Sequence, residues 1–216
     1  MNKITLFKIS MVLVLSVVSM WAGFKLSSML DEKNQVPVIE GTVLNPPRAL
    51  TPFKLIDQRR HDFRLEQFNG KWSLVFFGYT NCPDVCPNTL GVLKQAYIDM
   101  QALKMKLPQV VFVSVDPVRD EPELLSDYVY YFDPSFVGVT GKKDQLDNLA
   151  KQLSAVYLKA AGASGDIKKD DYLYDHSAAI LLINPKAEFQ AVFTAPHNKL
   201  GLVDGLQKTM KFYQAQ

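Results

Sequence analysis

The sequence predicts an α/β domain in which helices flank a mixed central sheet. Two continuous apolar segments, Trp72–Tyr79 and Ala178–Ile183, are typical of strands buried on both faces. Strand-like and helix-like segments alternate between them, and a hairpin and a helix end the chain, which favours a mixed sheet. Hydrophobic residues make up 48% of the chain and charged residues 21%, so the composition suits a core that folds without a disulfide or a metal.

Each element of this domain follows from a local pattern. Strands are expected at Phe53–Ile56, Asp62–Arg64, Trp72–Tyr79, Val110–Val115, Phe136–Val139, Val156–Lys159, Ala178–Ile183 and Glu188–Phe193. Helices are expected where apolar residues recur every three or four positions, at Asn88–Lys104, from Asp120 or Glu121 to Phe132, at Gln145–Leu153 and at Asn198–Tyr213.

Residues 1–30 are expected to form an N-terminal transmembrane anchor. Ile9–Phe24 carry no charge, and Lys25 can snorkel and so extend this apolar segment. A cleaved signal peptide is the alternative, but residues 20–28 offer a poor cleavage site. Because two lysines precede the apolar segment, the sequence predicts a single-pass protein of a bacterial inner membrane with its domain in the periplasm.

Residues 31–50 are expected to be a linker and residues 51–216 the folded domain. The linker is mixed in charge, contains three prolines and lacks periodicity. The chain has a net charge of +2, and residues 1–28 hold three lysines and no acid, which leaves 21 of the 24 basic residues against 22 acidic ones. Because this remainder is nearly neutral, we expect no nucleic-acid partner.

The segment Phe77–Pro87 contains both cysteines, at the point where a buried strand ends and a helix begins. Ligands bind at this edge of an open α/β sheet, and the order of strand, cysteines and helix predicts a thioredoxin-like fold. Because a residue before proline avoids the helical region, Cys86 is expected as the helix N-cap, with Pro87 at the first helical position. The helix N-terminus is expected to lower the pKa of both thiols.

Three residues separate Cys82 from Cys86, where thiol-disulfide oxidoreductases usually have two. The longer loop can close a disulfide, and it can also hold two thiolates on one soft ion such as Cu(I). A structural zinc site would need two further ligands. A stabilising disulfide without further chemistry is a third alternative, because both cysteines are expected to face an oxidising compartment.

His176 is the candidate third ligand of a metal. It lies just before the strand Ala178–Ile183, where a thioredoxin-like fold brings the chain toward the cysteine motif. Asp175 can orient the imidazole, or it can be a solvated turn carboxylate. His61 lies in a charged turn and His197 at the start of the last helix, so solvation and helix capping explain these two histidines.

Four segments resemble the signature blocks of the Sco/SenC copper chaperones: FFGYTNCPDVCPNTL, VSVDPVRDEPELLSDY, FVGVTG and DHSAAILLINP. The resemblance covers roughly residues 50–215 and implies a thioredoxin-like fold. It implies one copper ion per chain, Cu(I) or Cu(II), bound by Cys82, Cys86 and His176. It also implies delivery of copper to the copper A site of cytochrome c oxidase, or reduction of the cysteines of that site. Glu121 departs from the family pattern, which often has threonine there.

Two functions are therefore expected from the sequence: a copper chaperone, or a periplasmic thiol-disulfide oxidoreductase in which Cys82 and Cys86 form a redox disulfide. The expected partners are the oxidase subunit that carries the copper A site, a copper donor protein, a thiol reductant and the membrane. A peroxiredoxin has threonine three residues and proline seven residues before its reactive cysteine. Counted from Cys86, these positions hold Pro83 and Tyr79, which argues against a peroxidase.

Overall fold

The computed structural model describes residues 11, 13–25, 27, 35–166 and 171–216. Within these residues, eight strands form one sheet in the order β1-β10-β9-β4-β5-β6-β2-β3, and β7 and β8 form a separate two-stranded sheet. Strand β4 runs parallel to β5, and β5 runs parallel to β6, while the other neighbouring pairs are antiparallel. The predicted mixed sheet is therefore confirmed.

The strands of the main sheet are β1 (Gly41–Ala49), β2 (Lys54–Asp57), β3 (Asp62–Arg64), β4 (Ser73–Gly78), β5 (Gln109–Ser114), β6 (Val137–Thr140), β9 (Ile180–Ile183) and β10 (Glu188–Phe193). The separate sheet consists of β7 (Tyr157–Ala160) and β8 (Leu173–His176). The helices are the short 3-10 helix η1 (Leu65–Phe68), α2 (Val85–Ala102), α3 (Pro122–Phe132), α4 (Lys143–Gln152) and α5 (Lys199–Gln214).

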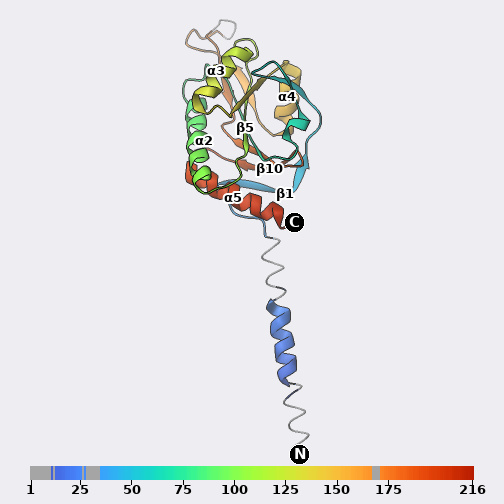
Figure 1. Ribbon diagram of the computed structural model, residues 1–216. Coiled ribbons are helices and arrows are strands. Elements are labelled where there is room, and N and C mark those ends of the chain that lie inside the picture. The colour runs from blue at the N-terminus through green and yellow to red at the C-terminus, as the bar shows by residue number, and fades with distance from the viewer. Residues whose placement is uncertain (1–10, 12, 26, 28–34, 167–170) are drawn as a thin grey trace, which may run out of the picture. The chain divides into compact units, whose positions relative to one another are not determined.

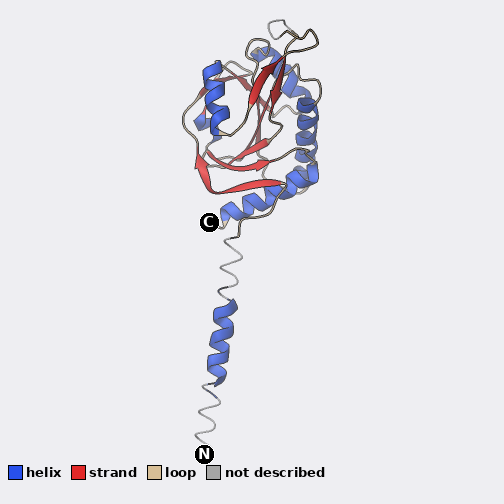
Figure 2. Cartoon of the chain, turned by 180° about the vertical axis from the view of Figure 1, so that it is seen from behind, coloured by secondary structure: helices blue, strands red, loops and turns tan. Residues whose placement is uncertain are grey.

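Helices cover both faces of the sheet (Figures 1 and 2). Leu146 of α4 joins the hydrophobic core on the face that contains Phe77. On the opposite face, the ring of Phe112 lies 6.1 Å from that of Phe76 and 5.4 Å from that of Tyr128 in α3. Because both faces are covered, all six residues of β4 are buried, and a central strand of this kind needs an apolar sequence throughout.

The predicted linker is shorter than expected, because residues Gly41–Ala49 form the edge strand β1. This strand pairs with β10, and its register shifts between Val43 and Arg48. Pro46 and Pro47 lie within that shift. Proline cannot donate to a strand ladder and is confined to edges and bulges, so the two prolines concealed an edge strand from the sequence analysis.

The chain divides into two compact units, Val38–Thr209 and a smaller unit of Met1–Pro37 with Met210–Gln216. In the smaller unit, residues 13–25 are helical. Among the residues that the structure describes, no helix combines the length and the apolar character that a membrane crossing requires. Part of the predicted anchor, residues 1–10, 12, 26 and 28–30, lies outside the described residues, so the anchor stays a prediction.

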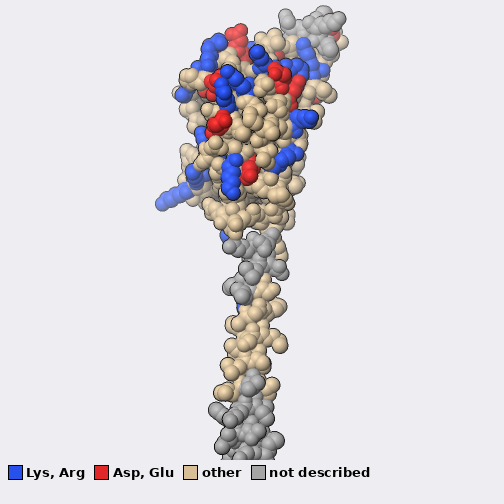
Figure 3. All heavy atoms as spheres, turned by 90° about the vertical axis from the view of Figure 1, so that its right-hand side faces the viewer, with Lys and Arg blue, Asp and Glu red and all other residues tan. Residues whose placement is uncertain are grey.

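Charges are mixed on the surface of the larger unit. Basic and acidic side chains are interspersed on the face seen in Figure 3. This distribution agrees with the nearly balanced charge of the chain beyond its first residues.

Candidate metal centre

The cysteine loop, residues 79–84, connects β4 to α2. The Cys82 N–H donates a hydrogen bond to the Tyr79 carbonyl at 3.2 Å, which closes a tight turn directly after the strand. Cys82 lies half-buried in this loop, and Cys86 lies fully buried in the first turn of α2. The loop therefore presents one accessible and one enclosed sulfur.

The helix begins two residues earlier than predicted. Asp84 is the N-cap of α2 and Val85 its first residue, so Cys86 is inside the helix and is not its cap. Pro87 is compatible with this start, because the first backbone N–H groups of a helix have no partner within it. The earlier start places the Cys86 N–H 3.4 Å from the Cys82 sulfur, to which it donates a hydrogen bond.

The histidine hairpin, β7 and β8, brings His176 to these two sulfurs. The His176 Nε2 atom lies 3.3 Å from the Cys86 sulfur and 3.9 Å from the Cys82 sulfur. All three ligand atoms lie within 4.8 Å of one another. The structure therefore gathers the three side chains that the sequence analysis singled out as metal ligands.

The two cysteines have opposite pKa shifts. The pKa of Cys82 is lowered to about 4, first by a hydrogen bond from the Cys86 thiol and then by His176 and backbone N–H groups, although burial opposes the shift. The pKa of Cys86 is raised, because its proton is held by the Cys82 sulfur and because it is buried. At neutral pH the metal-free reduced pair therefore carries one thiolate, on Cys82, and one thiol, on Cys86.

The imidazole of His176 is held by aromatic side chains and by the backbone. The rings of Phe76 and Tyr79 each meet it edge-on, with centroids 5.9 Å away. Its Nδ1 atom lies 3.2 Å from the Ser177 carbonyl oxygen. A proton on Nδ1 can be donated to this carbonyl, which leaves the lone pair of Nε2 free to bind a metal next to the sulfurs.

Asp175, which the sequence analysis offered either as a group that orients the imidazole or as a solvated carboxylate, is exposed. Successive side chains of a strand point to opposite faces, and in β8 His176 is half-buried while Asp175 is exposed. Asp175 pairs with Leu158 across the hairpin, and the Ser177 carbonyl is the group next to Nδ1. This position favours a solvated carboxylate over a group that orients the imidazole.

The other two histidines do not belong to this group of ligand atoms. His61 has a 75% exposed side chain, 3.7 Å from the carboxylate of Asp57. His197 lies 2.6 Å from the Ala178 carbonyl oxygen through Nε2. Asn198, and not His197, caps α5, since its side-chain oxygen accepts a hydrogen bond from the Gly201 N–H.

Gly78, the last residue of β4, is a part of the centre that the sequence analysis missed. A β-carbon at this position would lie 2.6 Å from the Cys86 sulfur and 2.7 Å from a ring carbon of Phe112. Only glycine leaves room for the Cys86 thiol against the strand. The sequence signal was present, because this glycine interrupts an apolar strand directly before the cysteine motif.

Asp120 is the second missed residue, and it fixes the start of the cysteine loop. Its buried carboxylate accepts hydrogen bonds from the Thr80 N–H at 2.8 Å, the Thr80 hydroxyl at 2.6 Å and the Ser114 hydroxyl at 2.5 Å. Burial raises the pKa of Asp120, although these hydrogen bonds oppose the shift. No local pattern could have shown a link across 40 residues of sequence.

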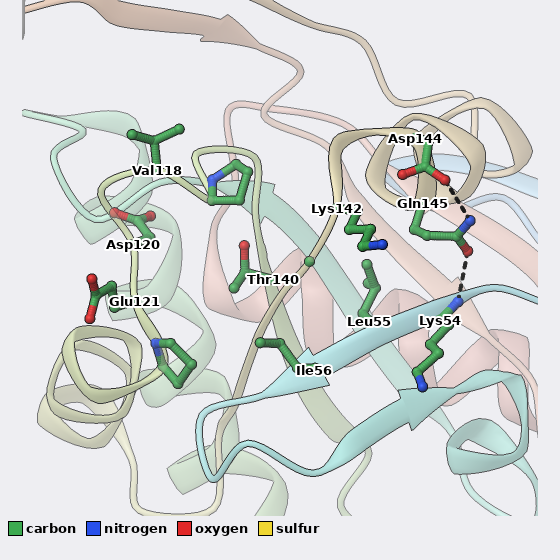
Figure 4. Close-up of a pocket in the computed structure, with 13 residues that line it drawn as sticks. Lys54, Leu55, Ile56, Val118, Asp120, Glu121, Thr140, Lys142, Asp144 and Gln145 are labelled. Atoms are coloured by element: carbon green, nitrogen blue, oxygen red, sulfur yellow. Dashed lines mark hydrogen bonds between the residues drawn. The ribbon is translucent and has the colours of Figure 1, made fainter.

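Asp120 also lines a pocket of about 810 Å³ (Figure 4). Its walls come from β2, from the segment between β5 and α3, and from the beginning of α4, and they are mostly apolar. The side chain of Gln145 accepts a hydrogen bond from the Lys54 N–H and donates one to Asp144. The carboxylate that holds the cysteine loop is thus also part of a pocket wall.

Comparisons with known proteins find a matching family model and relatives that are described with copper. A family model described as SCO1/SenC matches residues 42–211. A curated protein of Stutzerimonas stutzeri, whose name describes copper binding, is 32% identical over 184 residues, which cover 85% of this chain and 83% of that protein.

An Arabidopsis thaliana protein named SCO1 homolog 1, mitochondrial, is 31% identical over 182 residues, and the chain spans about half of its length, 53%. The crystal structure of ScoI from the same organism with copper bound is 30% identical, with a TM-score of 0.68 over 76% of this chain and 98% of that chain.

Proposed function

Because the chain belongs to the SCO1/SenC family, we propose that it binds one copper ion through Cys82, Cys86 and His176 and delivers it to another protein. The observation that carries this proposal is the convergence of two sulfurs and one imidazole nitrogen. Metal bonds of about 2.0–2.3 Å, as found for zinc with these atoms, place the ligand atoms roughly 3.5–4 Å apart. The two nitrogen–sulfur distances, 3.3 and 3.9 Å, are close to that spacing.

The ligand set suits copper as cargo. Two thiolates favour the soft ion Cu(I), and imidazole binds both copper oxidation states. Cys82 is already a thiolate at neutral pH, whereas Cys86 must lose the proton that its raised pKa retains. Copper uptake therefore releases the Cys86 proton, and return of that proton favours release of the metal.

Three protein ligands also leave one side of the ion open to an incoming ligand. A client can bind the ion there before any of the three protein bonds breaks, so transfer proceeds by stepwise exchange. Following the family resemblance, we place the client at the copper A site of cytochrome c oxidase. A copper donor protein and a thiol reductant complete the expected set of partners.

The proposed location is a bacterial inner membrane, with residues 1–30 as a single-pass anchor and the larger unit in the periplasm. The uncharged segment Ile9–Phe24 and the two lysines before it support this topology. Fractionation of cells with an epitope on Gln216 and protease treatment of intact spheroplasts test it. Recovery of the whole chain in the soluble fraction would contradict the anchor.

A second candidate function is reduction of a disulfide in the client. It is supported by the low pKa and partial exposure of Cys82, because a thiolate is the attacking species. Cys82 would attack the client disulfide and form a mixed disulfide, and Cys86 would then attack the Cys82 sulfur and release the client dithiol. The chain would be left with a Cys82–Cys86 disulfide, which a thiol reductant must reduce.

Copper stoichiometry of the reduced whole chain tests the main proposal. About one copper ion is expected in the parent, with a large loss in Cys82→Ala, Cys86→Ala and His176→Ala. His61→Ala is the matched control, because it removes a histidine that lies apart from the centre. Full retention in His176→Ala would contradict the three-ligand site. A parent that binds no copper would favour the reductase, and the rate of client disulfide reduction would then be measured.

A further inference from the structure

The hairpin that carries His176 has little stability of its own. Strands β7 and β8 pair only with each other, over four residues each, and form no part of the main sheet among the described residues. A two-stranded hairpin in water is marginally stable unless it packs against another element. The position of His176 therefore depends on what holds this hairpin against the rest of the domain.

Tyr172, directly before β8, provides one such attachment. Its side chain is buried, and its hydroxyl donates a hydrogen bond to the carboxylate of Asp116 at 2.8 Å. The guanidinium of Arg119 lies over the Tyr172 ring, 3.7 Å from its centroid, and donates to the Tyr172 carbonyl at 3.0 Å. Arg119 is itself paired with Asp116, so the ring is fixed by an ion pair whose carboxylate is buried.

Strand β8 connects Tyr172 with the metal centre. Tyr172, Tyr174 and His176 alternate along the chain and point to the same face. The ring of Tyr174 meets those of Tyr172 and Tyr79 edge-on, at 5.8 and 5.6 Å, and the His176 ring lies beside Tyr79 as well. A continuous row of packed rings thus connects the fixed tyrosine with the imidazole.

The segment after β5 holds both halves of the centre. Asp120 fixes the cysteine loop through Thr80, and Asp116 fixes the histidine hairpin through Tyr172. The two carboxylates are four positions apart in one tight segment, and the Asp120 N–H donates to the Asp116 carbonyl oxygen at 2.9 Å. The segment that contains Asp116 and Asp120 therefore fixes the distance between the sulfur and nitrogen ligands.

We propose that Tyr172, held by Asp116 and Arg119, is a positioning residue that sets how closely His176 approaches the copper ion. This inference rests on the proposed function, because it concerns the third ligand of the same site. Groups that orient a metal ligand from outside the coordination sphere typically change metal affinity by about 10–100-fold when they are removed. Tyr172 acts through His176 and is not a ligand.

Tyr172→Phe tests the proposal, because it removes only the hydroxyl that Asp116 binds. Tyr157→Phe is the matched control: its hydroxyl donates to Asp147 of α4 at 2.5 Å and so also attaches the hairpin, but this hydrogen bond is exposed, whereas that of Tyr172 to Asp116 is buried. We expect Cu(I) affinity, measured by competition with a chelator, to fall about tenfold or more in Tyr172→Phe. It should stay within about twofold of the parent in Tyr157→Phe.

Two further readouts separate positioning from loss of stability. The nitrogen coupling in the electron paramagnetic resonance spectrum of the Cu(II)-loaded chain should weaken in Tyr172→Phe and persist in Tyr157→Phe. In a His176→Ala background, Tyr172→Phe should cause no additional loss of affinity, because the residue through which it acts is gone. In the metal-free chain, amide exchange of β8 should become faster in Tyr172→Phe.

Parent-like affinity and nitrogen coupling in Tyr172→Phe would overturn the proposal, even if that variant unfolds more easily. An equal loss of affinity with and without His176 would overturn it too. If Tyr172→Phe does not fold, Arg119→Lys takes its place, since lysine keeps the charge near Asp116 but not the planar group over the ring. A parent that binds no copper is a distinct result, which overturns the proposed function and this inference with it.

Discussion

The two halves of the metal centre are held in different ways. The cysteine loop leaves a central strand that is buried on both faces and enters an 18-residue helix, so it is anchored at both ends. The histidine hairpin lies outside the main sheet and meets the loop through side chains on one face of β8. The sulfur ligands are therefore held by elements of the core, whereas the imidazole is held by a hairpin that packs against the core.

This difference fits the task of a protein that must bind copper and then release it. A ligand on a marginal hairpin can move without unfolding the domain, while two sulfurs fixed to the core keep the ion in place. We expect the imidazole bond to be the first to break during transfer. The comparison predicts that changes at the cysteine loop affect folding and binding together, whereas changes at the hairpin affect binding more selectively.

Gly78→Ala should give the largest effect, because it acts on the cysteine half from within the core. The added β-carbon would lie 2.6 Å from the Cys86 sulfur, so the strand or α2 must shift. We expect the free energy of unfolding to fall by about 3 kcal/mol, as for other overpacked cores, with loss of copper binding. Chemical denaturation and copper stoichiometry measure the two effects.

Gly91→Ala is the control for that substitution. Gly91 lies in α2, and a β-carbon there has no neighbour within 4 Å. Replacing glycine inside a helix by alanine should stabilise the chain by about 0.5–1 kcal/mol. Equal stability of Gly78→Ala and the parent would show that the Cys86 thiol is not held against the strand.

The pKa of Cys82 depends on both halves of the centre and allows their effects to be compared. It is lowered to about 4 by Cys86 in the first turn of α2 and, to a smaller extent, by His176 from the hairpin. In the reduced metal-free chain, Cys86→Ala should therefore raise the pKa of Cys82 more than His176→Ala does. The pH dependence of alkylation of Cys82 measures this pKa, and equal shifts in the two variants would contradict the dominant role of Cys86.

Asp120→Asn should have a moderate effect that depends on pH. Burial raises the pKa of Asp120 above the value of 3.8 expected in the unfolded chain. Its contribution to stability is therefore fully present below pH 3.8 and is lost as the pH rises through the folded-state pKa. Asparagine cannot titrate, so the stability of the variant should lack this pH dependence. Its free energy of unfolding should also fall by about 1–2 kcal/mol, because the amide group faces hydrogen-bond donors.

Asp147→Asn is a useful contrast for the pH experiment. Lys143 and Tyr157 lower the pKa of Asp147, so its contribution has the opposite sign and is lost as the pH falls. Denaturation curves over a range of pH, recorded for both variants and the parent, measure the two dependences. The same pH profile in Asp120→Asn and the parent would contradict a titrating carboxylate under the cysteine loop.

Local signals account for what the sequence predicted well. The apolar segment before the cysteines shows the buried central strand, and Pro87 places the beginning of a helix near Cys86, two residues later than observed. The elements Glu188–Phe193 and Pro122–Phe132 were expected within two residues of their observed bounds, because a turn and an N-terminal proline mark them.

Non-local contacts account for what the sequence did not show. Strand β1 exists because β10 offers it an edge, despite its two prolines. The attachments of Thr80 to Asp120 and of Tyr172 to Asp116 join residues 40 and 56 positions apart, and no periodicity encodes such pairs. The position of His176 was expected, but the Ser177 carbonyl beside its Nδ1 atom was not.

Asp175→Asn tests whether this carboxylate orients the imidazole, and it should give the smallest effect of all. The side chain points away from the imidazole and is exposed, so its charge has little influence on the ligands. Exposed substitutions usually change free energies by less than about 0.5 kcal/mol, so copper affinity should stay within about twofold of the parent. The same chelator competition that measures Tyr172→Phe applies, with His176→Ala as the positive control. A large loss of affinity would mean that β8 turns over when copper binds, since only then could the carboxylate reach the imidazole.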